Sequence, residues 1–288
     1  MTVRFMESWQ NIRILMAGAL FVVSLGGCGS GESSLQRGNM AFQKGELSEA
    51  AEFYQQALQS DATRSVASYN LGRVYFEQGD YAKALELFDQ ALPVETEQPS
   101  VRIYRARAAM ELGRQDEAER GFRSAVKIHP EIGESHLYLA KFLASQGDRE
   151  EALKAIGPAL KFSELQEEAT LLAATWQMEM KRPAEAAALL DELLKTHGDR
   201  YQTYLELAKA HLAAGKTRGA ELALRRGLAL NPGEVEGLYY LGVALKAQSQ
   251  DDLASQLFQA VVEKDEGAWR DRAREQLEGL TPTSRSES

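Results

Sequence analysis

Apolar side chains recur at three- and four-residue spacing through most of the chain, which is the pattern of amphipathic helices. Residues 68–92 show it clearly. They contain two apolar stripes, Leu71, Val74 and Tyr75 in the first and Ala84, Leu85, Phe88 and Ala91 in the second. Gly79 lies between the stripes, where a glycine readily takes a positive φ and ends a helix. The segment therefore predicts two helices joined by a tight turn.

The same pattern returns every 34 residues without insertion or deletion. A turn position recurs as Gly45, Gly79, Gly113, Gly147, Lys181, Gly215 and Ser249. Five residues later comes an alanine: Ala50, Ala84, Ala118, Ala152, Ala186, Ala220 and Ala254. Four residues further comes a large side chain: Tyr54, Phe88, Phe122, Ile156, Leu190, Leu224 and Phe258. Seven such units cover residues 31–268 and predict an all-α array, because one helix pair cannot bury both of its apolar faces alone.

The last unit of such an array needs a cover with a polar outer face. Residues 269–280 predict a cap helix, with charges outward and four apolar side chains inward, Trp269, Ala273, Leu277 and Leu280. Residues 281–288 offer nothing to bury, and we expect them to be disordered.

The residues of the second unit resemble the tetratricopeptide repeat. The residues that carry the resemblance are Asn70, Leu71, Gly72, Tyr75, Gly79, Tyr81, Ala84, Phe88 and Ala91, together with Pro130 and Pro232 at the ends of units three and six. The resemblance implies a right-handed α-solenoid of seven helix pairs over residues 35–280. It also implies that the first helices line a concave groove that binds polypeptides, and that no cofactor is needed.

Two units depart from the pattern. Unit five has Lys181 in place of the turn glycine, and two residues later has Pro183, which is tolerated in the first turn of a helix. Its Trp176 fits a core position filling space beside small residues, with ligand stacking as the alternative. Unit four contains Gly157 and Pro158 inside its second helix, which predicts a kink, because proline removes a backbone hydrogen bond.

The resemblance also places candidate binding residues in the groove. The ninth residue of each unit reads Asn39, Arg73, Arg107, Lys141, Thr175, Lys209 and Val243, with three consecutive cations. With their neighbours they form a basic and aromatic stripe: Tyr69, Asn70, Arg73, Phe76, Tyr104, Arg107, Tyr138 and Lys141. Such a stripe suits an extended peptide that carries carboxylates. The alternative is that the cations keep the concave surface soluble while the tyrosines pack between helices.

A subset of the family clamps the C-terminal carboxylate of chaperones. Asn39 and Asn70 match that clamp, whereas Leu35, Ser100 and Tyr104 occupy its cationic positions. The match is too poor to support a chaperone clamp.

The N-terminal residues have the pattern of a targeting signal. Arg4 and Arg13 precede a short apolar run at 14–25, which is too short to span a bilayer but suits a secretory signal. The run ends in Leu25-Gly26-Gly27-Cys28 and resembles a bacterial lipoprotein signal. The resemblance implies cleavage after residue 27, lipid on Cys28, and a tether over 28–34. Gly29, in place of aspartate, favours the outer membrane over the inner, with the protein facing the periplasm.

Charge and composition narrow the function further. The formal net charge of −9 argues against nucleic-acid binding, which needs basic residues to replace phosphate counterions. The single cysteine excludes an intramolecular disulfide, and four scattered histidines predict no metal site. A regular solenoid also offers no enclosure for converging acids, so we expect no enzyme.

These observations predict a membrane-anchored scaffold that binds other envelope proteins or exported subunits. The chain is similar to repeat lipoproteins that help pili and secretins assemble, of the pilotin or Flp pilus type. The alternatives are an adaptor for cell-wall enzymes and a component of exopolysaccharide export.

Overall fold

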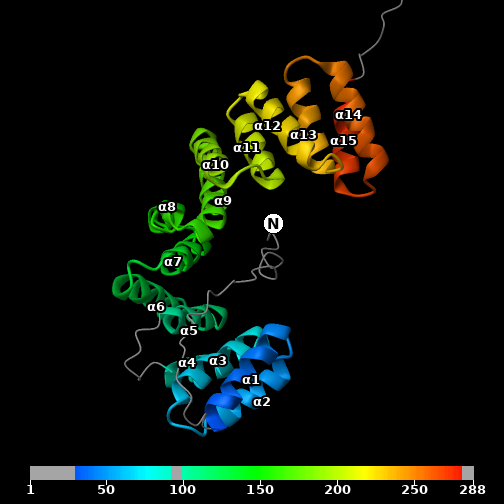
Figure 1. Cartoon of the computed structure of the whole chain (residues 1–288). Coiled ribbons are helices and arrows are strands. Elements are labelled where there is room, and N and C mark those ends of the chain that lie inside the picture. Colours follow the sequence, from blue (N-terminus) through cyan, green and yellow to red (C-terminus); the bar gives the residue numbers. More distant parts are fainter. Residues whose placement is uncertain (1–29, 92–98, 281–288) are drawn as a thin grey trace, which may run out of the picture.

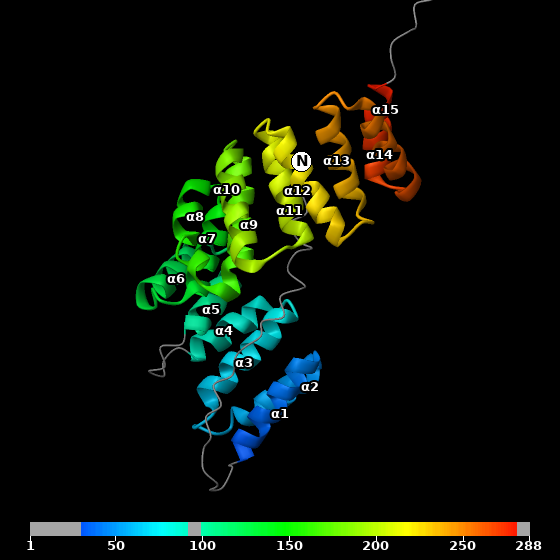
Figure 2. The same ribbon diagram turned by 45° about the horizontal axis from the view of Figure 1, so that its top comes forward.

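The chain is described by a computed structural model covering residues 30–91 and 99–280, and the described residues form helices and no strand (Figure 1). The helices stack in pairs along a curved, elongated array that begins at α1 and ends at α15 (Figures 1 and 2). This architecture confirms the predicted all-α solenoid of helix pairs with an additional C-terminal helix.

Each repeat contributes one helix to each of two layers. The first helices are α1 (Ser30–Lys44), α3 (Arg64–Glu77), α5 (Pro99–Glu111), α7 (Gly133–Ser145), α9 (Ser163–Glu179), α11 (Tyr201–Ala213) and α13 (Val235–Lys246). The second helices are α2 (Leu47–Ala57), α4 (Tyr81–Ala91), α6 (Gln115–Ile128), α8 (Arg149–Ile156), α10 (Pro183–His197), α12 (Thr217–Leu230) and α14 (Asp251–Lys264). The last helix, α15, spans Ala268–Glu278.

The recurring alanine and the large residue that follows it form the centre of each repeat. All seven alanines have no exposed surface, and the seven large side chains are at most 2% exposed. In three repeats a glycine of the first helix receives the ring: a Cβ atom at Gly38, Gly72 or Gly242 would lie 2.6–2.7 Å from Tyr54, Phe88 or Phe258. The close approach explains why glycine stands at these helical positions.

The turn between the two helices of each repeat uses a left-handed residue, as predicted. Gly45, Gly79, Gly113, Gly147 and Gly215 all have positive φ. Lys181 and Ser249 take the same conformation without being glycine, with φ of 58° and 59°. A side chain at positive φ is strained. The turns of repeats five and seven therefore carry backbone strain that the glycine turns lack.

Exchanging residues at two of these turns is expected to shift stability in opposite directions. Lys181→Gly relieves the strain and should raise the free energy of unfolding by about 0.5 kcal/mol, because part of the gain is lost to the freer unfolded chain. Gly113→Ala should lower it by about 1 kcal/mol, because only the backbone opposes the new Cβ atom, which meets no other atom within 4 Å. Urea unfolding measures the change in unfolding free energy of each variant. Changes of the same sign in both variants would contradict this explanation.

Repeat four differs from the prediction at Gly157 and Pro158. We expected one kinked helix, whereas α8 ends at Ile156 and a 3-10 turn, η1, follows at Ala159–Lys161. Pro158 carries no N–H to continue the α-helical hydrogen bonds, so the chain stops and restarts. The turn still packs, because η1 contacts both α7 and α9.

The departures in repeat five fall where the sequence predicted. Pro183 stands at the first turn of α10. Trp176 is 5% exposed and belongs to the core cluster with Ala173, so the core interpretation is confirmed and the stacking alternative is not needed.

The C-terminal helix covers repeat seven. Its Ala273 is fully buried, and the ring of Trp269 lies 5.2 Å from that of Tyr239. Leu277 and Leu280 pack against the same cluster, as predicted. A carboxylate oxygen of Asp265 accepts hydrogen bonds from the backbone N–H groups of Trp269 and Arg270 at 2.9 and 3.1 Å, which fixes the start of the helix.

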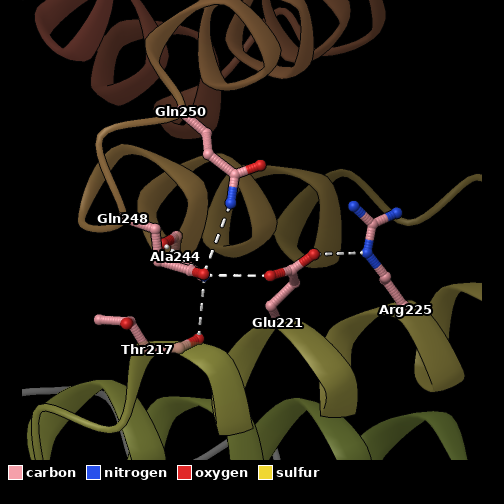
Figure 3. A network of polar contacts seen from close by, with 6 residues as sticks. All are labelled: Thr217, Glu221, Arg225, Ala244, Gln248 and Gln250. Carbon is pink, nitrogen blue, oxygen red and sulfur yellow. Dashed lines mark hydrogen bonds and ion pairs between the residues drawn. The ribbon is translucent and has the colours of Figure 1, made fainter.

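Repeats six and seven are joined by a polar network (Figure 3). The side-chain amide of Gln248 donates to the backbone oxygen of Thr217 and to the carboxylate of Glu221 at 3.4 and 3.1 Å. Arg225 binds the other oxygen of that carboxylate at 2.8 Å. The turn after α13 is therefore tied to the first two turns of α12.

The beginning of the array is earlier than predicted. We expected a tether over 28–34, but α1 begins at Ser30, so residues 30–34 are helical. A Cβ atom at Gly31 would lie 2.6 Å from Cβ of Ser60, so the first turn of α1 packs against the loop after α2. The predicted signal at 1–27, Cys28 and the tail at 281–288 lie outside the described residues.

Candidate functional site

The inner face of the array is made by the first helices. Each of them contacts the first helix of the next repeat, from α1 through α13, and the second helices of the described repeats make no comparable contact. The first helices therefore lie on the inside of the curve, where the predicted stripe belongs.

The first cation of the stripe, Arg73, is surrounded by rings. Its guanidinium carbon lies 4.6 Å from the ring centre of Phe42, 5.7 Å from Tyr69 and 5.4 Å from Tyr104. The rings come from α1, α3 and α5, so three repeats meet at this side chain. Its Nε atom is buried and has no hydrogen-bond partner.

The second cation, Arg107, repeats the arrangement one step along the array. Its guanidinium carbon lies 4.5 Å from the ring centre of Phe76, 4.7 Å from Tyr104 and 5.1 Å from Tyr138. The side chain is largely buried, so the faces of these rings replace much of its hydration.

The third cation, Lys141, combines a ring with an acid. Its ammonium lies 5.2 Å from the ring centre of Tyr138 and forms an ion pair with Glu168 of the next repeat. The predicted cations are thus interleaved with the predicted aromatics.

The rings of the stripe are largely part of the core. Tyr104 lies edge-on to Tyr69 and Phe76 at 5.9 and 5.8 Å, and it also contacts Phe88, the central ring of repeat two. Tyr69 and Phe76 are 6% and 9% exposed. The structure therefore brings all eight predicted residues to one region, but Tyr69 and Phe76 support the surface more than they form it.

Asn70 is positioned by hydrogen bonds. Its amide donates to the side-chain oxygen of Asn39 at 3.0 Å, and that oxygen also accepts from the hydroxyl of Tyr54 at 2.8 Å. The two asparagines that matched the chaperone clamp are thus bonded to each other across repeats one and two.

Burial changes the acidity of the stripe. It raises the pKa of the Tyr138 hydroxyl to about 12, although the charge of Arg107 acts in the opposite direction. Burial also raises the pKa of Tyr69, again against a nearby arginine, Arg73. Both hydroxyls therefore stay neutral at physiological pH.

Tyr138 is expected to make the protein sensitive to strong alkali. The hydroxyl ionises near 10 in the unfolded chain but only near 12 when folded, so its contribution to stability is complete below pH 10. That contribution is lost as the pH rises from 10 to 12. Tyr138→Phe should lessen the fall in unfolding free energy over this range, measured by urea unfolding at stepped pH, and an unchanged slope would contradict this assignment.

Acids also lie on the inner face, beyond the residues predicted from the sequence. Lys209 in repeat six forms ion pairs with Glu206 and Glu236 at 3.0 and 2.7 Å and lies 5.4 Å from the ring of Tyr240. Glu168 and Glu236 both stand at the second position of their repeats, 27 residues after the cation that each one binds. That fixed spacing was visible in the sequence. Phe42 was also missed, although it matches Phe76 one repeat later.

Two further hollows lie away from the inner face. One of about 440 Å³ is lined by Arg105, which binds Asp89 and Glu117 at 2.5 and 2.7 Å. Another of about 310 Å³ is lined by residues of α10, α11 and α12, among them His211. Within residues 30–91 and 99–280 no group of three histidine, cysteine or acidic side chains is arranged to hold a metal.

The stacked helix pairs and the ring-lined inner face define an α-helical repeat protein with a surface for binding other polypeptides. In the part of the chain that the structure describes, no helix has the length and apolar character to cross a bilayer.

The chain belongs to the tetratricopeptide-repeat family. One profile of that repeat matches residues 41–108, 75–131 and 177–234, which together exceed half of the 288 residues, and two further profiles match 105–162 and 236–266. Comparison with curated proteins gives no match. The fold of the family is that of a protein-interaction scaffold.

Solved structures agree on the fold. The C-terminal part of a repeat protein from Cytophaga hutchinsonii is 14% identical with a TM-score of 0.70, covering 84% of this chain and 99% of that one. A tetratricopeptide-repeat protein from Parabacteroides merdae is 19% identical with a TM-score of 0.55, covering 87% and 98%. At such low identity these likenesses show the architecture alone.

Proposed function

We propose that this protein is a lipid-anchored scaffold of the bacterial envelope that holds a segment of a partner protein against its inner face. The single observation that supports binding is the stripe itself, in which cations and rings alternate over repeats one to four. Burial of cations on the inside of the curve suits a ligand of complementary charge better than it suits solubility alone.

The anchor is proposed from the sequence. The apolar run that ends in Cys28 supports lipidation, cleavage after residue 27 and a periplasmic location on the outer membrane. The scaffold would then gather exported subunits near one leaflet, as a factor in pilus or secretion-system assembly. A role as adaptor for cell-wall enzymes or in exopolysaccharide export uses the same surface and anchor.

Reversing the charge of the stripe tests the binding. The variant Arg73→Glu, Arg107→Glu, Lys141→Glu should lose a partner that the wild type captures, identified by crosslinking from the inner face in the native cell. A matched variant reverses three arginines on other helices, Arg120, Arg218 and Arg274, and should keep the partner. Both carry the same net charge, so loss in both variants, or in neither, would contradict a binding role for the stripe.

Removing the proposed lipid site tests the anchor. Cys28→Ala should move the protein from the membrane fraction to the soluble periplasmic fraction and abolish labelling with radioactive palmitate. If pilus or secretin subunits then remain in the wrong membrane, the assembly role gains support, whereas altered peptidoglycan turnover with intact pili would favour the adaptor role. Unchanged membrane retention and no palmitate label in the wild type would overturn the anchor.

A further inference from the structure

The cations of the inner face are neutralised by the repeat that follows them. Lys141 pairs with Glu168, and Lys209 Nζ lies 2.7 Å from the Glu236 carboxylate. Glu134 stands at the same place after Arg107. Burial raises the pKa of Glu134, and the strongest opposing influence is the charge of Arg107. Each pair joins residues 27 apart, from the ninth position of one repeat to the second of the next.

Arg73 is the cation of this series that lacks the matching acid. The residue 27 positions later is Ser100, not glutamate. No ion pair to Arg73 is found among the described residues, and its Nε atom is buried without a hydrogen-bond partner. The charge of Arg73 also lowers the pKa of Glu134, but less than the charge of Arg107 does.

As far as the structure describes the chain, the surroundings of Arg73 provide aromatic rings and no acid. The rings of Phe42, Tyr69 and Tyr104 surround the guanidinium, and the Tyr104 hydroxyl also hydrogen-bonds with it, but none of these groups is a charged acceptor. A guanidinium presents its N–H groups as a planar fork that matches the two oxygens of a carboxylate. The ring of Tyr69 lies 5.7 Å from the guanidinium carbon, and its hydroxyl is buried without a hydrogen-bond partner.

We propose that Arg73 binds a carboxylate of the polypeptide held on the inner face, in the place that a glutamate of the next repeat occupies elsewhere. The inference rests on the proposed function and adds a chemical preference, namely for polypeptides that carry a carboxylate. The selective position lies between repeats two and three, because further along the array a carboxylate on the ligand would meet cations that already have an acid. The anion is an aspartate or glutamate side chain, or the C-terminal carboxylate of the partner.

The series supplies its own test variants. Ser100→Glu gives repeat three the acid that repeats four, five and seven have, and this acid should occupy Arg73 from within. Ser100→Gln is nearly the same size without the charge. In the opposite direction, Glu168→Gln removes the acid from Lys141 and should create a second position for a ligand carboxylate.

The probe is a synthetic array of random ten-residue peptides, made with free and with amidated C-termini. The wild type should prefer peptides with a carboxylate, and Ser100→Glu and Arg73→Gln should weaken the preferred peptides by about tenfold or more, as expected for a charge-assisted hydrogen bond. Ser100→Gln should remain within about twofold of the wild type, which is below the effect of a lost neutral hydrogen bond. Glu168→Gln should favour peptides with two acids. Circular dichroism and the urea midpoint verify that each variant is folded.

The outcomes separate this inference from the function on which it rests. Peptides that bind the inner face with no preference for acids, or whose preference survives both Ser100→Glu and Arg73→Gln, would overturn the inference and leave the scaffold standing. A wild type that binds no peptide would overturn both. Preference confined to free C-termini assigns the carboxylate to the chain end, and preference in both sets assigns it to a side chain.

Discussion

Phe88→Ala is expected to lower the free energy of unfolding of the N-terminal repeats by about 3–5 kcal/mol, the usual range for removing a buried aromatic ring. Phe88 has no exposed surface and fills the space left by Gly72. It also supports the stripe, because its ring lies 5.8 Å from that of Tyr104 and 6.1 Å from that of Tyr69. The cavity would therefore loosen the surroundings of Arg73 as well as the core.

The loss should be local, because repeats in a solenoid are stabilised by their neighbours and not by the whole chain. Hydrogen exchange read by mass spectrometry should show faster exchange in α3 to α5 and little change in α11 to α15. Leu222→Ala is the control: its side chain is 55% exposed, so the change should stay within about 0.5 kcal/mol. Uniform acceleration along the array would show that the chain unfolds as one unit.

Ending the chain at Lys264 is expected to unfold repeat seven or cause the protein to associate. The deletion removes α15 and with it the fully buried Ala273 and the ring of Trp269, which lies 5.2 and 5.8 Å from Tyr239 and Tyr240. Trp269 is partly buried, so its loss alone should cost less than the ~3–5 kcal/mol typical of a fully buried tryptophan. An apolar face exposed at the end of a solenoid invites contact with other molecules, because end repeats require a polar outer surface.

Light scattering and size-exclusion chromatography measure this association, and hydrogen exchange in α13 and α14 measures the unfolding. A chain ending at Leu280 retains the whole of α15 and is the matched control. A monomeric truncation at Lys264 with full protection in α14 would show that repeat seven needs no cap.

The periodic features of the fold could be predicted from the sequence because each is a local requirement repeated seven times. The turn positions favour glycine because they need a positive φ, and the buried positions favour alanine because a larger side chain would not fit between the helices. Both residues therefore recur at a fixed spacing, and the structure confirms both roles. The cap helix was predictable because its apolar residues follow the same spacing. These features depend on neighbours that are close in the chain.

The features that the sequence did not predict depend on competition between interactions. Proline at 158 was expected to bend a helix, but α8 ends at Ile156 instead and η1 packs against α7 and α9. Ser30 was expected in a tether, but it begins α1, and the first turn of that helix packs through Gly31 against the loop after α2. The periodic pattern of the sequence predicts neither the end of α8 nor the early start of α1.

The site falls between these cases. The positions of Arg73, Arg107 and Lys141 followed from the repeat, and the structure brings them to one face. Their electrostatic state did not follow, because it depends on acids 27 residues away and on how far the rings bury each cation. The acids could have been found by reading the second position of each repeat beside the ninth.

The series arrangement of the helix pairs also determines how the molecule would respond to tension. Each pair contacts the pair before and after it, so a pull between the two ends passes through every junction in turn. The shortest α-helix on that route is α8, with 8 residues. The first junction to open is expected beside α8, which would leave the part of the stripe in repeats one to three intact while the rest of the array lengthens.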